Sequence, residues 1–150
     1  MKKPWIAILV VILISVIVCY AKETIDAERV FIKTTAAQEE DKTELANYLY
    51  AQKLELAKKG MFASLKDYTI EKTEVYDGAL YYQDEFLDDS LGEGLYFTVR
   101  YSVLPAYNNS DWIAGNGVMG DDGWIYHKFS FVIFQKDSGG WRLVNEGTGP

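Results

Sequence analysis

The stretch from Trp124 to Glu146 constrains the fold more than any other part of the chain. Aromatic and branched residues alternate with other residues from 124 to 134, and the turn sequence KDSGG at 136–140 leads into a second short alternating run. Alternation with a period of two on both sides of a glycine-containing turn is typical of a β-hairpin. The sequence therefore predicts two antiparallel strands at the end of the chain.

The two faces of the first predicted strand differ in polarity. One face carries aromatic and branched residues around His127, and the other includes Lys128 and Ser130. Successive side chains of a strand point to opposite faces, so only one set can line the core. We expect the less polar set to be buried: Ile125, His127, Phe129, Phe131 and Ile133.

The N-terminal 21 residues form a segment distinct from the domain at residues 22–150. Lys2 and Lys3 precede an uninterrupted apolar run that ends near Tyr20. Positive charges before such a run predict a cytoplasmic N-terminus. We favour a retained transmembrane anchor, although a helix from Trp5 to Ala21 would span only about 25 Å of a hydrocarbon core of about 30 Å.

Two other fates of this segment stay open. Ala21 could be the last residue of a cleaved signal peptide. Alternatively, the residues up to Cys19 resemble a bacterial lipobox, although Val18 stands where a small residue is usual. All three fates place the domain at the cell membrane or beyond it, outside the cytoplasm.

The charge and the cysteine content exclude several functions. The chain carries a net charge of −7, and 13 basic residues stand against 22 acidic residues after position 21. Such a surface repels phosphate backbones, so no nucleic-acid partner is expected. Cys19 is the only cysteine and His127 the only histidine, so neither a disulfide nor a histidine-based metal site is expected in the domain.

The order of predicted elements indicates an α+β domain. Helical spacing of apolar residues predicts helices at 24–38 and from a cap at Asp41 to Gly60. Strand patterns follow at 68–76, 79–83 and 95–104, before a long connection from Ala106 to Gly123. We therefore expect two helices packed on one face of a curved antiparallel sheet of four to five strands.

This order, with Gly139-Gly140-Trp141 in the last hairpin and Gly147-Thr148-Gly149-Pro150 at the end, resembles the nuclear transport factor 2-like (cystatin-like) superfamily. In particular, the chain is similar to small membrane-tethered or lipoprotein domains of unknown function from Gram-positive bacteria. The resemblance covers about residues 25–150. It implies a cone in which the sheet wraps around a pocket, and it does not select one function, because this fold hosts many.

Four residues are candidate ligand contacts in such a cone. His127 is expected inside it, either as a general base or as a hydrogen-bonded core residue. The resemblance to ketosteroid-isomerase-like members makes Tyr101 and Tyr68 candidate phenols, but the strand at 95–104 holds no inward carboxylate to pair with them. Trp112 is one of the apolar residues of the long connection that could form a lid or a partner surface.

Two acidic groups are candidate Ca²⁺ ligands, but neither has the spacing of an EF-hand loop. We interpret both as solvated loops and expect no metal and no cofactor. The groups are Asp84, Glu85, Asp88 and Asp89, and Asp111, Asn116, Asp121 and Asp122.

No acid, base and nucleophile converge in this sequence. We therefore expect a membrane-tethered, extracytoplasmic binding or protein-interaction module without catalytic activity, whose partner is an unknown small molecule or protein. The alternative is a small hydrolase or isomerase that uses His127 and a tyrosine. A homodimerisation domain is the third hypothesis.

Overall fold

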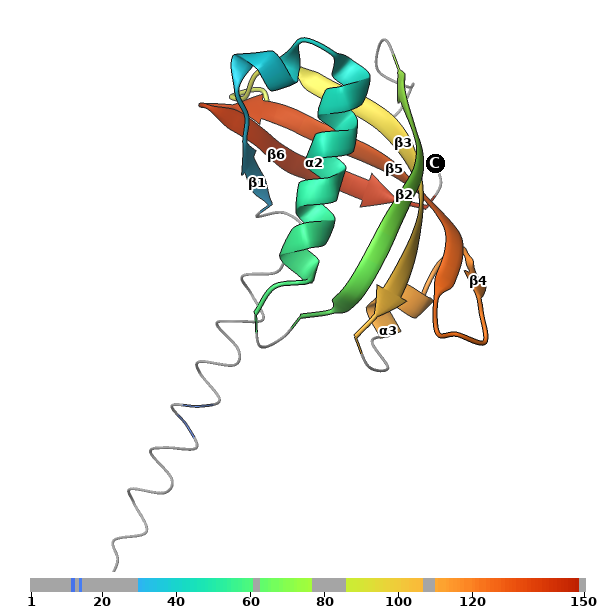
Figure 1. The fold of residues 1–150 in the computed structure, drawn as a ribbon. Helices are drawn as coiled ribbons and strands as arrows, with labels where there is room; N and C mark the ends of the chain where they lie inside the picture. Colours follow the sequence, from blue (N-terminus) through green and yellow to red (C-terminus); the bar gives the residue numbers. More distant parts are fainter. Residues whose placement is uncertain are drawn as a thin grey trace, which may run out of the picture.

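The computed structural model describes residues 12, 14, 30–60, 63–76, 86–106 and 110–148. In chain order its elements are β1 (Phe31–Lys33), the 3₁₀ helix η2 (Ala36–Glu39), α2 (Lys42–Ala57), β2 (Leu65–Tyr76), β3 (Gly94–Pro105), α3 (Ser110–Ile113), β4 (Val118–Met119), β5 (Ile125–Asp137) and β6 (Gly140–Gly147). One long helix, α2, accompanies the strands, of which β2, β3 and β5 are the longest (Figure 1).

The strands form one antiparallel sheet in the order β1-β6-β5-β3-β2, and β4 pairs separately with β5. The sheet curls into a half-barrel, and α2 lies across its concave face (Figure 1). The predicted α+β class, with a helix on a curved antiparallel sheet, is confirmed.

Helix α2 begins where the sequence predicts. The Asp41 carboxylate accepts hydrogen bonds from the backbone N–H groups of Thr43 and Glu44, at 2.8 and 2.9 Å. These bonds satisfy two of the donors that a helix N-terminus leaves without partners. The helix buries one apolar side against the sheet, through Leu45, Leu49, Tyr50 and Leu54.

The core lies between α2 and the concave face of β3, β5 and β6. The residues of β3 that face inward are buried: Leu95, Phe97, Val99, Tyr101 and Val103. The ring of Tyr50 meets the rings of Phe97 and Tyr101 edge-on, with centroids 6.3 and 5.2 Å apart. This aromatic contact fills the middle of the half-barrel.

The terminal hairpin is confirmed as β5 and β6. Of the residues predicted for the core face of β5, Ile125 and Ile133 are buried, but the prediction is wrong for His127, Phe129 and Phe131. His127 is exposed and has a positive φ of 56°, and β5 holds one residue more than β3 between the pairs Tyr101↔Lys128 and Val103↔Ile125. This bulge reverses the alternation after Ile125. Lys128, Ser130, Val132 and Phe134 are therefore the concave-face residues.

The predicted helix at 24–38 is also corrected. Within its described part, Phe31–Lys33 is strand β1, paired with Trp141 and its neighbours in β6, and Ala36–Glu39 is a 3₁₀ turn. The long connection from Ala106 to Gly123 contains α3 and β4. Among the described residues, the sheet thus has six strands instead of four to five.

Several predicted features lie outside the described residues. They are almost all of the N-terminal segment 1–21, the predicted strand at 79–83, and Asp84 and Glu85. No helix in the part that the structure describes is long and apolar enough to cross a membrane.

Candidate functional site

A polar cluster lies inside the half-barrel, between α2 and the last strand. The Tyr50 hydroxyl donates a hydrogen bond of 2.8 Å to Glu146 Oε1, and Lys53 Nζ forms an ion pair with Glu146 Oε2. Tyr50 and Lys53 are three residues apart in α2, so both reach the same strand. The side chains of Lys53 and Glu146 are only 13% and 17% exposed.

Glu146 occupies this place because of the register of β6. It stands opposite Val132, and both side chains point to the concave face. Burial raises the pKa of Glu146, but the charge and hydrogen bond of Lys53 and the hydroxyl of Tyr50 outweigh it, so the pKa lies below its ordinary value. The carboxylate is therefore ionised and held in place at neutral pH.

Tyr101 extends the cluster along the sheet. Its hydroxyl lies 3.3 Å from Ser130 Oγ, and its ring packs on Tyr50. Burial, followed by the negative charge of Glu146, raises the pKa of both tyrosines. Both phenols therefore remain protonated hydrogen-bond donors.

Lys128 is the second cation on this face and is 4% exposed. Its Nζ donates to the backbone carbonyls of Ala114 and Asn116, at 3.1 and 2.9 Å. Burial lowers the pKa of Lys128, while the charge of Glu146 opposes the shift. The ammonium thus holds the segment that follows α3 against the sheet.

Asn116 and Trp112 complete the attachment of this segment. The Asn116 side chain accepts from the Phe129 N–H and donates to its carbonyl, both at 2.8 Å, as a neighbouring strand would. The ring of Trp112 lies 5.6 Å from Lys53 Nζ, in a cation–π contact. The segment from Trp112 to Asn116 therefore covers this end of the polar cluster.

Tyr50, Tyr101 and the buried residues around them fill the middle of the half-barrel. A hollow of about 50 Å³ lies elsewhere, beside Glu39, Lys42, Glu93 and Trp141. Pockets for drug-sized ligands usually enclose roughly 300 Å³ or more. An ion-paired carboxylate with a lowered pKa is also a weak general base near neutral pH. The cluster is better suited to fixing the surface above it than to proton transfer.

That surface is the tip, which we define as residues 111–126 of α3, β4, the following turn and the start of β5. Three of its apolar side chains are at least half exposed: Ile113 (50%), Val118 (65%) and Met119 (51%). Each is a large apolar side chain that is left in solvent, and interaction surfaces contain such residues.

The turn of the tip is internally bonded. Asp122 accepts from the Tyr126 hydroxyl at 2.6 Å and from the Trp124 N–H at 3.2 Å. These two hydrogen bonds lower the pKa of Asp122. The rings of Trp124 and Tyr126 stack, with centroids 6.2 Å apart and an interplanar angle of 23°.

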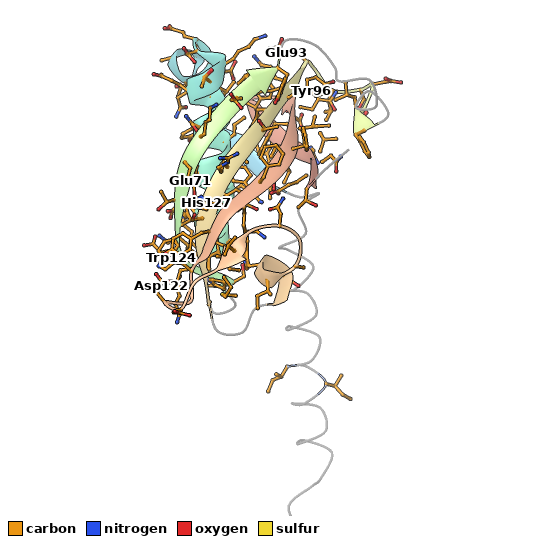
Figure 2. The ribbon with its side chains drawn as sticks, turned by 90° about the vertical axis from the view of Figure 1, so that its right-hand side faces the viewer. Glu71, Glu93, Tyr96, Asp122, Trp124 and His127 are labelled. Atoms are coloured by element: carbon orange, nitrogen blue, oxygen red, sulfur yellow. The ribbon has the colours of Figure 1, made fainter. Side chains whose placement is uncertain are left out.

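His127 lies on the opposite, convex face of the sheet. Figure 2 shows it beside Glu71, with Trp124 and Asp122 further toward the tip. The imidazole Nδ1 of His127 is 2.9 Å from Glu71 Oε2. The backbone N–H of His127 donates to Ser102 Oγ, and the Ser102 hydroxyl donates to Glu71 Oε1. Burial raises the pKa of Glu71, but the bonds from Ser102 and His127 outweigh it and lower the pKa. Glu71 occupies a bulge of β2 and His127 lies in the bulge of β5, so the two bulges meet here.

The four predicted ligand contacts are thus divided between two faces. Tyr101 belongs to the interior cluster and Trp112 covers it. Tyr68 lies on the concave face against α2, where its hydroxyl donates to the Ala51 carbonyl, and burial raises its pKa to about 12. His127 shares no site with these three.

Sequence reasoning missed the centre of the cluster: Tyr50, Lys53, Lys128 and Glu146. The polar pair Lys128 and Ser130 at a spacing of two was a usable signal, because two polar residues inside an aromatic strand can face one buried partner. Of the candidate acidic groups, Asp88 accepts from the N–H and the hydroxyl of Ser90. Within the described ranges, no three histidine, cysteine or acidic side chains are grouped as a metal site would require.

Comparisons with protein-family models, with curated proteins and with solved structures found no match to this chain.

Proposed function

We propose that this chain is a membrane-tethered, extracytoplasmic protein-interaction module with a nuclear transport factor 2-like fold and no catalytic activity, and that the tip is its contact surface. The observation that carries the proposal is the exposure of Ile113, Val118 and Met119 on a segment that is bonded firmly from below. A preformed surface loses little conformational entropy when a partner binds.

The support beneath the tip is specific. Lys128 and Asn116 together make four hydrogen bonds that fix the link between α3 and β4. Buried polar groups must be paired, so the link keeps one conformation. The apolar side chains that flank the link, Ile113, Val118 and Met119, nevertheless face solvent.

A protein partner fits the structure better than a small molecule or a substrate. The half-barrel is filled around Tyr50 and Tyr101, as described above. His127 and Tyr101 lie on opposite faces of the sheet, so the hydrolase or isomerase hypothesis lacks a shared site for these residues. A protein partner can bind the exposed side chains of the tip without a cavity.

The proposal is tested by photo-crosslinking in the native host. A photoreactive amino acid replaces Val118 in the full chain, and its control replaces Leu56, which is 47% exposed on α2. We expect discrete adducts with one protein from position 118 and none from position 56. When that protein is purified and mixed with the chain, the same adduct should form. Equal adducts from both positions, or none from either, would contradict the proposal.

The location is tested separately by adding protease to intact cells that carry the full chain. Cleavage of residues 30–148 without lysis is expected, because the proposal places the domain outside the membrane. Protection until the cells are broken would overturn this part of the proposal.

A further inference from the structure

We infer that the segment that docks on the tip is basic and amphipathic, with lysine or arginine residues next to apolar ones. This inference rests on the proposed function and adds the chemistry of the partner. Between Ser110 and His127 the chain holds three aspartates and no lysine or arginine. Asp111, Asp121 and Asp122 are all exposed.

The apolar and acidic parts of the tip are interleaved. Ile113 lies two residues from Asp111, and Val118 and Met119 are followed closely by Asp121 and Asp122. A partner that covers the tip therefore meets both apolar side chains and carboxylates. A purely apolar partner would desolvate the carboxylates of Asp121 and Asp122 without supplying a cation, which costs free energy.

The aromatic pair beside Asp122 gives the cation a further contact. Trp124 and Tyr126 stack and are partly exposed, and Tyr126 is tied to Asp122 through its hydroxyl. A guanidinium or ammonium group can lie over such a ring while it pairs with the adjacent carboxylate. The geometry thus provides a place for a lysine or arginine side chain.

The charge of the whole domain acts in the same direction. The excess of nine acidic residues after position 21 attracts a basic partner over a distance of about a Debye length. It disfavours an anionic lipid surface, which is attracted to polybasic segments instead. A protein segment is therefore the better occupant, although exposed aliphatic residues are also found where proteins touch membranes.

The adduct formed from position 118 provides the first test. The crosslinked partner peptide is sequenced, and we expect it to carry net positive charge within about ten residues of the crosslink. An acidic or neutral segment would overturn the inference but leave the proposed function intact. Absence of any adduct would be the failure of the proposed function itself.

The second test uses a synthetic peptide of alternating leucine and lysine as the probe. Its binding to the full chain in detergent is measured by fluorescence anisotropy at low and high salt. The test variant carries Asp111→Asn, Asp121→Asn and Asp122→Asn. The control removes the same charge with Glu40→Gln, Asp89→Asn and Glu93→Gln, and Figure 2 shows Glu93 at the other end of the sheet.

We expect the tip variant to weaken peptide binding by about tenfold or more, and the control by less than about twofold, because only tip charges lie next to bound cations. Equal losses in the two variants would overturn the inference, since they would reflect net charge alone. Binding of the wild-type chain to phosphatidylglycerol vesicles that is lost when Val118 and Met119 become serine would also overturn it, in favour of a membrane surface.

Discussion

Glu146 pairs with Lys53 and accepts from the Tyr50 hydroxyl, so its removal should be costly. Glu146→Gln leaves the Lys53 ammonium buried without a counterion, and breaking a buried pair from one side costs roughly 3 kcal/mol or more. We expect the free energy of unfolding in urea to fall by that amount, and the double variant with Lys53→Met to recover part of the loss. A loss as small as that of Glu74→Gln, from the exposed Lys72–Glu74 pair, would contradict the prediction.

The same carboxylate should set part of the acid sensitivity. Its pKa in the folded protein lies below the ordinary value of 4.5, so its contribution to stability is present above pH 4.5 and is lost as pH falls through the folded value. The free energy of unfolding, followed by urea titration at a series of pH values, should therefore depend less on pH below 4.5 in Glu146→Gln than in the wild type. Parallel curves would show that Glu146 is not stabilised as an anion.

For single residues, the sequence predicts which side chains adjoin the core better than it predicts the face to which each one points. The resemblance makes Tyr101 a candidate phenol, and its place in the long connection makes Trp112 a candidate contact; both adjoin the cluster. His127 was placed on the wrong face because no glycine or proline marks the bulge at its position. Glu146 was missed because a carboxylate near the end of a strand gives no sign of the lysine that pairs with it, 93 positions away.

The link between α3 and β4 depends on a glycine. Gly117 has a φ of 110°, and a Cβ atom there would lie 2.8 Å from Lys128 Cγ and 2.9 Å from Ile125 Cγ2. Gly139 also has a positive φ, of 76°, but its Cβ would meet nothing within 4 Å.

We therefore expect Gly139→Ala to cost about 1 kcal/mol, from backbone strain alone, and Gly117→Ala to cost at least about 1 kcal/mol more, because overpacking adds to it. Hydrogen exchange should also show faster exchange at Phe129 only in Gly117→Ala, because the clash displaces Asn116 from its backbone partner. Equal costs and equal exchange in the two variants would show that the link is not tightly packed.

Elements with local signals were predictable, and those that depend on distant pairing were not. Helix α2 has a cap at Asp41 and a continuous apolar side, and the β5–β6 hairpin has its turn in the sequence. Strand β1 has three residues, and the apolar spacing around it resembles that of a helix. It forms a strand because it pairs with β6, which is more than 100 residues away. The two residues of β4 are likewise defined by the strand that they pair with.

For the whole molecule, the filled half-barrel leads to a prediction about space. Tyr50 is fully buried at the centre of the aromatic contacts, so Tyr50→Ala should cost about 3–5 kcal/mol and leave a cavity of the size of a phenol ring. Phenol should raise the thermal midpoint of this variant and leave that of the wild type unchanged, because a ligand stabilises only the state that binds it. Stabilisation of both proteins by phenol would mean that the wild type already has a pocket.

The pairing of β1 with β6 joins the first described strand to the last. A nascent chain that still lacks Trp141 and its neighbours offers β1 no edge, and the concave face that α2 covers is incomplete. Such a chain cannot close its core, because β6 supplies Trp141 and Leu143 to it. The sheet can therefore be completed only after β6 has been synthesised.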